Sequence, residues 1–170
     1  MQIKESGMDF GNYSEEQVYH IEVSGLYQTL RPKGIKCCEF ILLRESKILL
    51  IEAKTSCPKE IEASSSEERK LKYNEYIDDI CLKMKHTIQL YACVVLKRLK
   101  DESLPKALAD TDLSKYQIKP ILVVKMAEKE WLPSLADVLN RKIINLKRIW
   151  NLDNLLVLNE DMARRKGLVI

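Results

Sequence analysis

The chain has 170 residues, of which 46% are hydrophobic and 31% charged, with a formal net charge of +3 at pH 7. A chain of this length buries roughly 70% of the surface that its unfolded form exposes, so we expect one domain over residues 1–170. No apolar run approaches the ~20 residues needed to span a bilayer, and the polar N-terminus lacks the apolar core of a secretory signal. We therefore expect no membrane partner and a cytoplasmic location.

Cysteine spacing and charge distribution bear on compartment and partners. None of the five cysteines stands in a Cys-x-x-Cys pair with the spacing of a zinc site, which favours a reducing compartment. Residues 141–170 hold seven basic and three acidic side chains, whereas the first 140 residues sum to about −1. A basic C-terminal third suits a polyanion partner, and a solvated helix face with a charged tail explains it equally well.

The first part of the chain predicts little regular structure. Residues 1–16 are glycine-containing and polar, and we expect an irregular lead-in. Residues 17–23 (QVYHIEV) alternate in a way that suits a strand, but Ser14 and Gln17 have capping-box spacing, so a short helix competes. Glu22 lies in this segment under either interpretation.

A β-hairpin follows. Two apolar runs, residues 40–43 and 48–51, flank the polar link 44–47, which is typical of two antiparallel strands joined by a short loop. The start of one antiparallel strand lies beside the end of the next, so Glu39 should lie close to Glu52 and Lys54. Side chains two apart on a strand share a face, so Glu52 and Lys54 point one way and Ala53 the other.

The rest of the chain alternates between helices and strands. Apolar residues at intervals of three and four predict a long amphipathic helix from residue 67 to about 100, followed by a loop over 101–115. We then expect a strand at 118–126, a helix at 134–150 and a short strand at 155–158. A paired hairpin followed by strands separated by helices predicts an α/β fold, a mixed β-sheet flanked by helices.

The charged residues of the hairpin suit metal-dependent phosphodiester hydrolysis. Two carboxylates and an amine at the edge of an apolar sheet are costly to bury unless they are paired or bind a cation. Glu39 and Glu52 would hold Mg²⁺ or Mn²⁺, and the carbonyl of Ala53 could join them. Lys54 would orient the attacking water and stabilise the charge that develops on phosphorus. A plain ion-pair cluster that protects a strand edge is the competing interpretation.

Glu39 followed thirteen residues later by Glu52-Ala53-Lys54 at the end of an apolar strand resembles the PD-(D/E)xK nuclease superfamily. The resemblance covers a core of about residues 17–126 and implies a restriction endonuclease-like fold with a four-stranded mixed sheet. It also implies DNA as substrate, Mg²⁺ as cofactor, Glu39 and Glu52 as metal-binding acids and Lys54 as the catalytic lysine. An upstream glutamate and a glutamine on the following helix are further family features, for which the candidates are Glu22, Glu16 and Gln89.

Some features leave alternatives open. The first acid of the family is usually Asp preceded by Pro, whereas here it is Glu39 preceded by Cys38. A nuclease-fold protein that cleaves weakly or not at all, and that acts as a nucleic-acid-binding or assembly subunit, is therefore the second functional hypothesis. Neither His20 nor His86 has a partner at coordinating spacing, so neither is expected to bind metal. The small size also allows a homodimer.

Overall fold

A five-stranded mixed sheet forms the centre of the protein in the computed structural model, which describes residues 1–170. The predicted class, a mixed α/β sheet flanked by helices, is confirmed at this level. The sheet has one strand more than the resemblance implies. Its order is β3-β4-β5-β6-β7, antiparallel as far as β5 and parallel from β5 to β7. These strands are β3 (Val18–Tyr19), β4 (Phe40–Arg44), β5 (Lys47–Ser56), β6 (Gln117–Met126) and β7 (Leu156–Asn159).

The N-terminal segment is not irregular, and the prediction for residues 1–16 is wrong. Strands β1 (Gln2–Glu5) and β2 (Met8–Gly11) form a separate antiparallel hairpin. Its two-residue turn, Ser6-Gly7, has positive φ at both positions, a conformation that suits the twist of a tight hairpin. Ile3, Met8 and Phe10 are buried, so this short hairpin is held by packing against the larger sheet.

The segment 17–23 is only partly a strand. Strand β3 contains two residues, preceded by a 3₁₀ turn, η1 (Glu15–Gln17), and followed by a second, η2 (Ile21–Val23). Ser24 then caps helix α1 (Gly25–Leu30), its hydroxyl accepting a hydrogen bond from the Tyr27 amide, and η3 (Arg31–Lys33) completes this excursion.

Helix α2 (Glu67–Val95) is the long covering helix that the periodicity predicts. It begins where Ser66 accepts a hydrogen bond from the Arg69 amide, and it ends before the predicted residue 100, where Lys97 adopts a left-handed conformation. The predicted helix at 134–150 is interrupted at Ile143. The remaining helical elements are α3 (Lys106–Ala109), η4 (Lys129–Trp131), α4 (Leu132–Lys142), α5 (Ile144–Trp150) and α6 (Glu160–Arg165).

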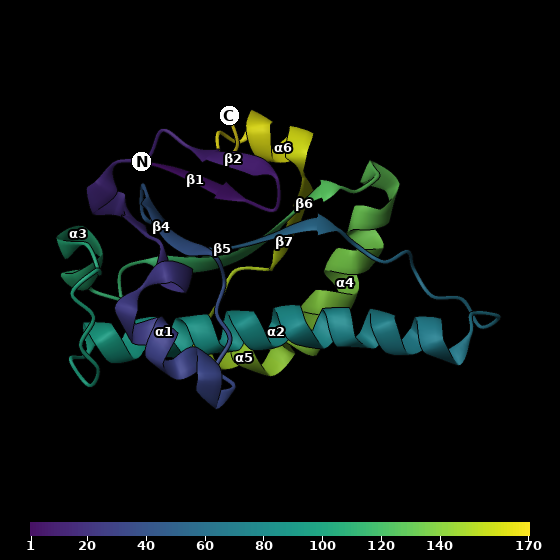
Figure 1. Cartoon of the computed structure of the whole chain (residues 1–170), viewed down its shortest axis with the longest axis horizontal. Helices are drawn as coiled ribbons and strands as arrows, with labels where there is room; N and C mark the ends of the chain where they lie inside the picture. The colour runs from purple at the N-terminus through teal and green to yellow at the C-terminus, as the bar shows by residue number, and fades with distance from the viewer.

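The two faces of the sheet are covered by different elements. Figure 1 shows α1, α2, α4 and α5 on one side, and the β1–β2 hairpin with α6 on the other. The core follows this division: Leu50 of β5 packs with Ile80 and Met84 of α2, whereas Ile51 packs with Met8 of the hairpin. Alternate residues of β5 therefore face α2, and this places Glu52 and Lys54 between the sheet and that helix.

The basic C-terminal third does not form one surface. Its cationic residues on α4 and α5 lie on the α2 side of the sheet, whereas those on α6 lie on the hairpin side (Figure 1). The positive charge of this segment is thus divided between opposite faces. None of the helices combines the length and apolar character needed to cross a membrane.

Candidate functional site

The β4–β5 hairpin brings Glu39 and Glu52 together as predicted. Phe40 pairs with Ile51 across the two strands, and the Glu39 amide donates a hydrogen bond of 3.0 Å to the Ile51 carbonyl. Glu39 therefore lies directly across from Glu52. The two residues are 5% and 0% exposed, so both carboxyl groups are removed from bulk water.

Lys54 extends the same face of β5. Its ammonium nitrogen lies 3.2 Å from Oε1 of Glu52, and its side chain is 26% exposed, so the pair reaches from the interior towards solvent. Ala53, between them, is buried in the core on the opposite face of the sheet. The predicted alternation of these three residues is thus confirmed.

A second lysine, Lys83, enters the site from helix α2, and the sequence reasoning missed it. Its Nζ lies 2.8 Å from Oε1 of Glu52 and 3.8 Å from Oε1 of Glu39. Burial by itself would lower the pKa of Lys83, but the charges of Glu52 and Glu39 outweigh it and raise that pKa. Lys83 is therefore a buried cation shared by two acids.

Asp79 lies one turn before Lys83 on helix α2 and forms an ion pair with Lys54 of strand β5. Its Oδ2 lies 3.3 Å from Nζ of Lys54, and its Oδ1 lies 2.5 Å from Nζ of Lys36. Burial acts to raise the pKa of Asp79, but the hydrogen bonds and charges of the two lysines lower it overall. A signal for both helix residues is present in the sequence: Asp79, Lys83 and Thr87 recur every four residues on the face that packs on the sheet.

Glu22, the candidate for the upstream glutamate of the family, lies beside Glu39. It stands in the 3₁₀ turn η2 and not in a helix. Its amide donates a hydrogen bond of 3.3 Å to the carbonyl of Glu39. Glu5 of strand β1 and His20 adjoin it, since one ligand atom from each of Glu5, His20 and Glu22 lies within 4.8 Å of the others. Nε2 of His20 lies 3.3 Å from Oε1 of Glu5. The alternative candidate, Glu16, is exposed in η1.

The carboxyl groups raise one another's affinity for protons. Burial, a hydrogen bond with Glu22 and the negative charge of Glu52 raise the pKa of Glu39 to about 10. Burial also raises the pKa of Glu52, against the lowering effect of Lys83 and Lys54. The pKa of Glu5 rises through burial and the charge of Glu22. Glu39 is thus ionised at neutral pH only when further positive charge is supplied.

One oxygen of Glu52 provides a test of whether these residues fit a metal ion. Oε2 of Glu52 is buried and has no hydrogen-bond partner. The hydroxyl group of the nearby Tyr76 is also buried without a partner. An unpaired buried carboxylate oxygen is costly, and it is also the kind of hard ligand that Mg²⁺ and Mn²⁺ prefer. The three ligand atoms that lie within 4.8 Å of one another belong to Glu5, His20 and Glu22, whereas Glu22, Glu39 and Glu52 do not form such a group. Glu39 and Glu52 thus offer an ion two carboxylates, one of them with a free oxygen, and water would fill the other ligand positions.

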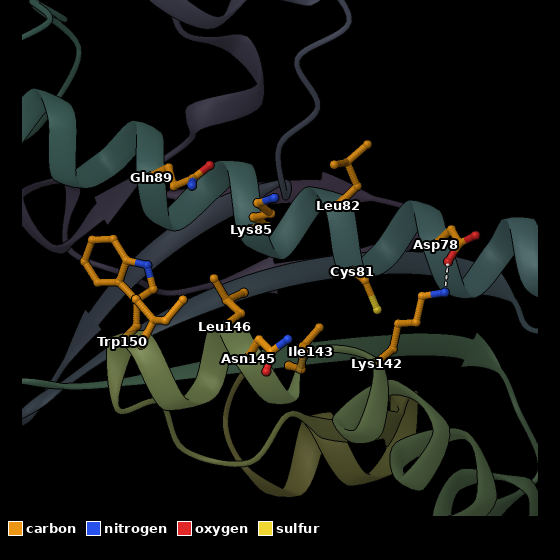
Figure 2. A pocket seen from close by; sticks show the side chains of 11 residues that line it. Asp78, Cys81, Leu82, Lys85, Gln89, Lys142, Ile143, Asn145, Leu146 and Trp150 are labelled. Carbon is orange, nitrogen blue, oxygen red and sulfur yellow. Dashed lines mark ion pairs between the residues drawn. The ribbon is translucent and has the colours of Figure 1, made fainter.

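Gln89 does not belong to this site. It is exposed on helix α2, on the side that borders a groove of about 510 Å³ between α2 and α5. Figure 2 shows Gln89 there with Lys85, across from Trp150, and the ion pair of Asp78 with Lys142 at the other end of the groove. The structure therefore does not bring Gln89 to the carboxylates, because the α2 face that meets the sheet carries Lys83 and Thr87.

Comparisons of the chain with protein-family models, with curated proteins and with solved structures found no match.

Proposed function

We propose that this protein is a Mg²⁺- or Mn²⁺-dependent nuclease that hydrolyses phosphodiester bonds in DNA, with a restriction endonuclease-like fold. The observation that carries the proposal is the convergence of Glu39, Glu52 and Lys54 at one edge of a mixed sheet, with a buried Glu52 oxygen that lacks a partner. The order of hairpin β4–β5, helix α2 and parallel strand β6 supports the fold assignment. DNA as the substrate comes from the PD-(D/E)xK resemblance.

Each residue has a role in this reaction. Glu39 and Glu52 would hold the ion, with Glu22 beside them and the Ala53 carbonyl as a further candidate ligand. When bound, the ion would supply Lewis acidity to water and to the phosphate. Lys54, whose side chain is partly exposed and pairs with Glu52, would orient a water and stabilise negative charge on the phosphate.

A second candidate function is a nuclease-fold subunit that binds nucleic acid or assembles with other proteins without efficient cleavage. The observation in its favour is Lys83, which already supplies a positive charge to both Glu39 and Glu52. A protein in which this lysine already pairs with the buried Glu52 can keep its fold without a metal ion.

Metal binding and cleavage separate the two functions. Calorimetry should show Mn²⁺ binding to the wild type and loss of that binding in Glu52→Gln, while plasmid DNA is nicked only by the wild type with Mg²⁺ or Mn²⁺. Glu68→Gln is the matched control, since Glu68 is an exposed acid of α2 that pairs with Lys72. Absence of metal-dependent cleavage of DNA and RNA, single- or double-stranded, would leave the binding function as the better description.

A further inference from the structure

The ammonium group of Lys83 lies in the gap between the two acids. It is 2.8 Å from Oε1 of Glu52 and 3.8 Å from Oε1 of Glu39. An ion held by Glu39 and by the free Oε2 of Glu52 would also lie within a few ångströms of Nζ, because Mg²⁺ and Mn²⁺ bind carboxylate oxygens at roughly 2.1 Å. Two cations that close together in a poorly hydrated site repel each other strongly.

The position of Lys83 is set by the packing of α2. Lys83 lies between Ile80 and Met84, which are fully buried against the sheet, and its own side chain is 14% exposed. Lys54 differs in this respect, because its ammonium is more exposed and is shared with Asp79. Among the acids, Lys83 contacts only Glu39 and Glu52.

We propose that Lys83 is a built-in counter-cation that competes with the divalent ion for Glu39 and Glu52, so that the ion binds only when Nζ moves away from these two acids. The inference rests on the proposed metal site. It makes Lys83 a residue that sets metal affinity: the lysine supplies the counter-charge of Glu52 when no ion is bound, and its displacement is part of every binding event.

Three variants test this competition at pH 8. In Lys83→Met the side chain keeps its length and loses its charge, and we expect Mn²⁺ to bind about tenfold more tightly, or better, than in the wild type. Lys83→Arg keeps the charge, so its affinity should stay close to that of the wild type. Lys85→Met is the control, because Lys85 is exposed on the groove side of the same helix (Figure 2).

The readouts are the dissociation constant for Mn²⁺ from calorimetry and the rise in melting temperature on adding Mn²⁺. The rise in melting temperature can be measured even if Lys83→Met is unstable without metal. The competition predicts that Mn²⁺ raises the melting temperature of this variant more than that of the wild type. Equal or weaker Mn²⁺ binding by Lys83→Met, beside a wild type that binds Mn²⁺, overturns the competition and leaves the proposed function intact. If none of these proteins binds Mn²⁺, the proposed metal site fails together with the inference.

Discussion

Asp79 of helix α2 holds the ammonium group of Lys54 of strand β5, with 3.3 Å between Oδ2 and Nζ. The same carboxylate contacts Lys36, which precedes strand β4, at 2.5 Å. One acid thus links the covering helix to both sides of the hairpin. The lysine that we place at the phosphate therefore owes its orientation to a residue 25 positions further along the chain.

Asp79→Asn should slow cleavage by about tenfold, because the amide keeps the shape of the side chain but no longer attracts Lys54. Mn²⁺ affinity and DNA affinity should stay near the wild-type values, since Asp79 contacts neither of the proposed metal-binding acids. Asp79→Glu restores the charge and should recover part of the rate. The exposed neighbour Asp78, changed to Asn, is the control in the same plasmid-nicking assay. A wild-type rate in Asp79→Asn would show that Lys54 does not need this partner.

Lys54→Ala should abolish cleavage, a loss of about 100-fold or more, while leaving DNA binding largely intact. The reason is that the ammonium acts on charge that develops during the reaction, and one lysine contributes little to total DNA affinity. Lys47→Ala is the control: Lys47 lies at the other end of β5, near Asp153. Nicking assays and fluorescence anisotropy with labelled DNA measure the two effects. Parallel loss of binding and cleavage in Lys54→Ala would contradict the assigned role.

Glu39→Gln should stabilise the metal-free protein at high pH. The folded protein holds the Glu39 proton up to a pKa of about 10, whereas the ordinary pKa of a solvated glutamate, as in the unfolded chain, is 4.5. Between these values the folded state binds more protons, so the contribution of Glu39 to the free energy of unfolding falls as pH rises. Well inside this pH range, the free energy of unfolding falls by at most about 1.4 kcal/mol per pH unit because of this one group. Glu39→Gln lacks this titration.

Urea unfolding in EDTA at pH 5, 7 and 9 measures the effect. The difference in stability between Glu39→Gln and the wild type should grow with pH in favour of the variant. A constant difference across this range would mean that Glu39 is already ionised in the folded protein. An exposed acid such as Glu15, changed to Gln, should show no such trend.

Glu5→Gln tests whether the β1–β2 hairpin contributes to the metal site. Glu5 lies beside Glu22, which in turn adjoins Glu39, so its negative charge should strengthen binding of a cation held by those acids. We expect Mn²⁺ affinity to fall by about tenfold, measured by calorimetry, with little change in folding stability. The exposed Asp9 of strand β2, changed to Asn, serves as the control. Unchanged affinity in Glu5→Gln would confine the site to Glu22, Glu39 and Glu52.

Local patterns predict most of the fold because they report on burial. The alternation and apolar runs of β4 and β5 identify the hairpin, and its antiparallel pairing alone is enough to place Glu39 across from Glu52. Apolar residues recur every three or four positions in α2, and they identify this helix because they are the residues that it buries. The β1–β2 hairpin escaped prediction because each strand has four residues and buries few side chains, which leaves little periodic signal.

The break at Ile143 and the shortness of β3 have a different origin. The apolar pattern continues through both segments, so nothing local marks where the regular structure stops. Asn140 donates a hydrogen bond to the Leu155 carbonyl and accepts one from its amide, tying the end of α4 to the start of β7. Contacts of this kind join residues that are distant in sequence, and they decide where an element ends.

Strand alternation and antiparallel register are local rules, so the order of residues in the central hairpin is enough to predict that Glu39, Glu52 and Lys54 lie on one face of it. The residues around these three depend on how distant parts of the chain pack: Lys83 and Asp79 come from the covering helix, and Glu5, His20 and Glu22 from the N-terminal segment. It also removed Gln89 from the site, because the rotation of α2 about its axis is set by packing on the sheet. Buried charge is expensive, so the identity of its partners is decided by three-dimensional contacts that spacing along the chain does not reveal.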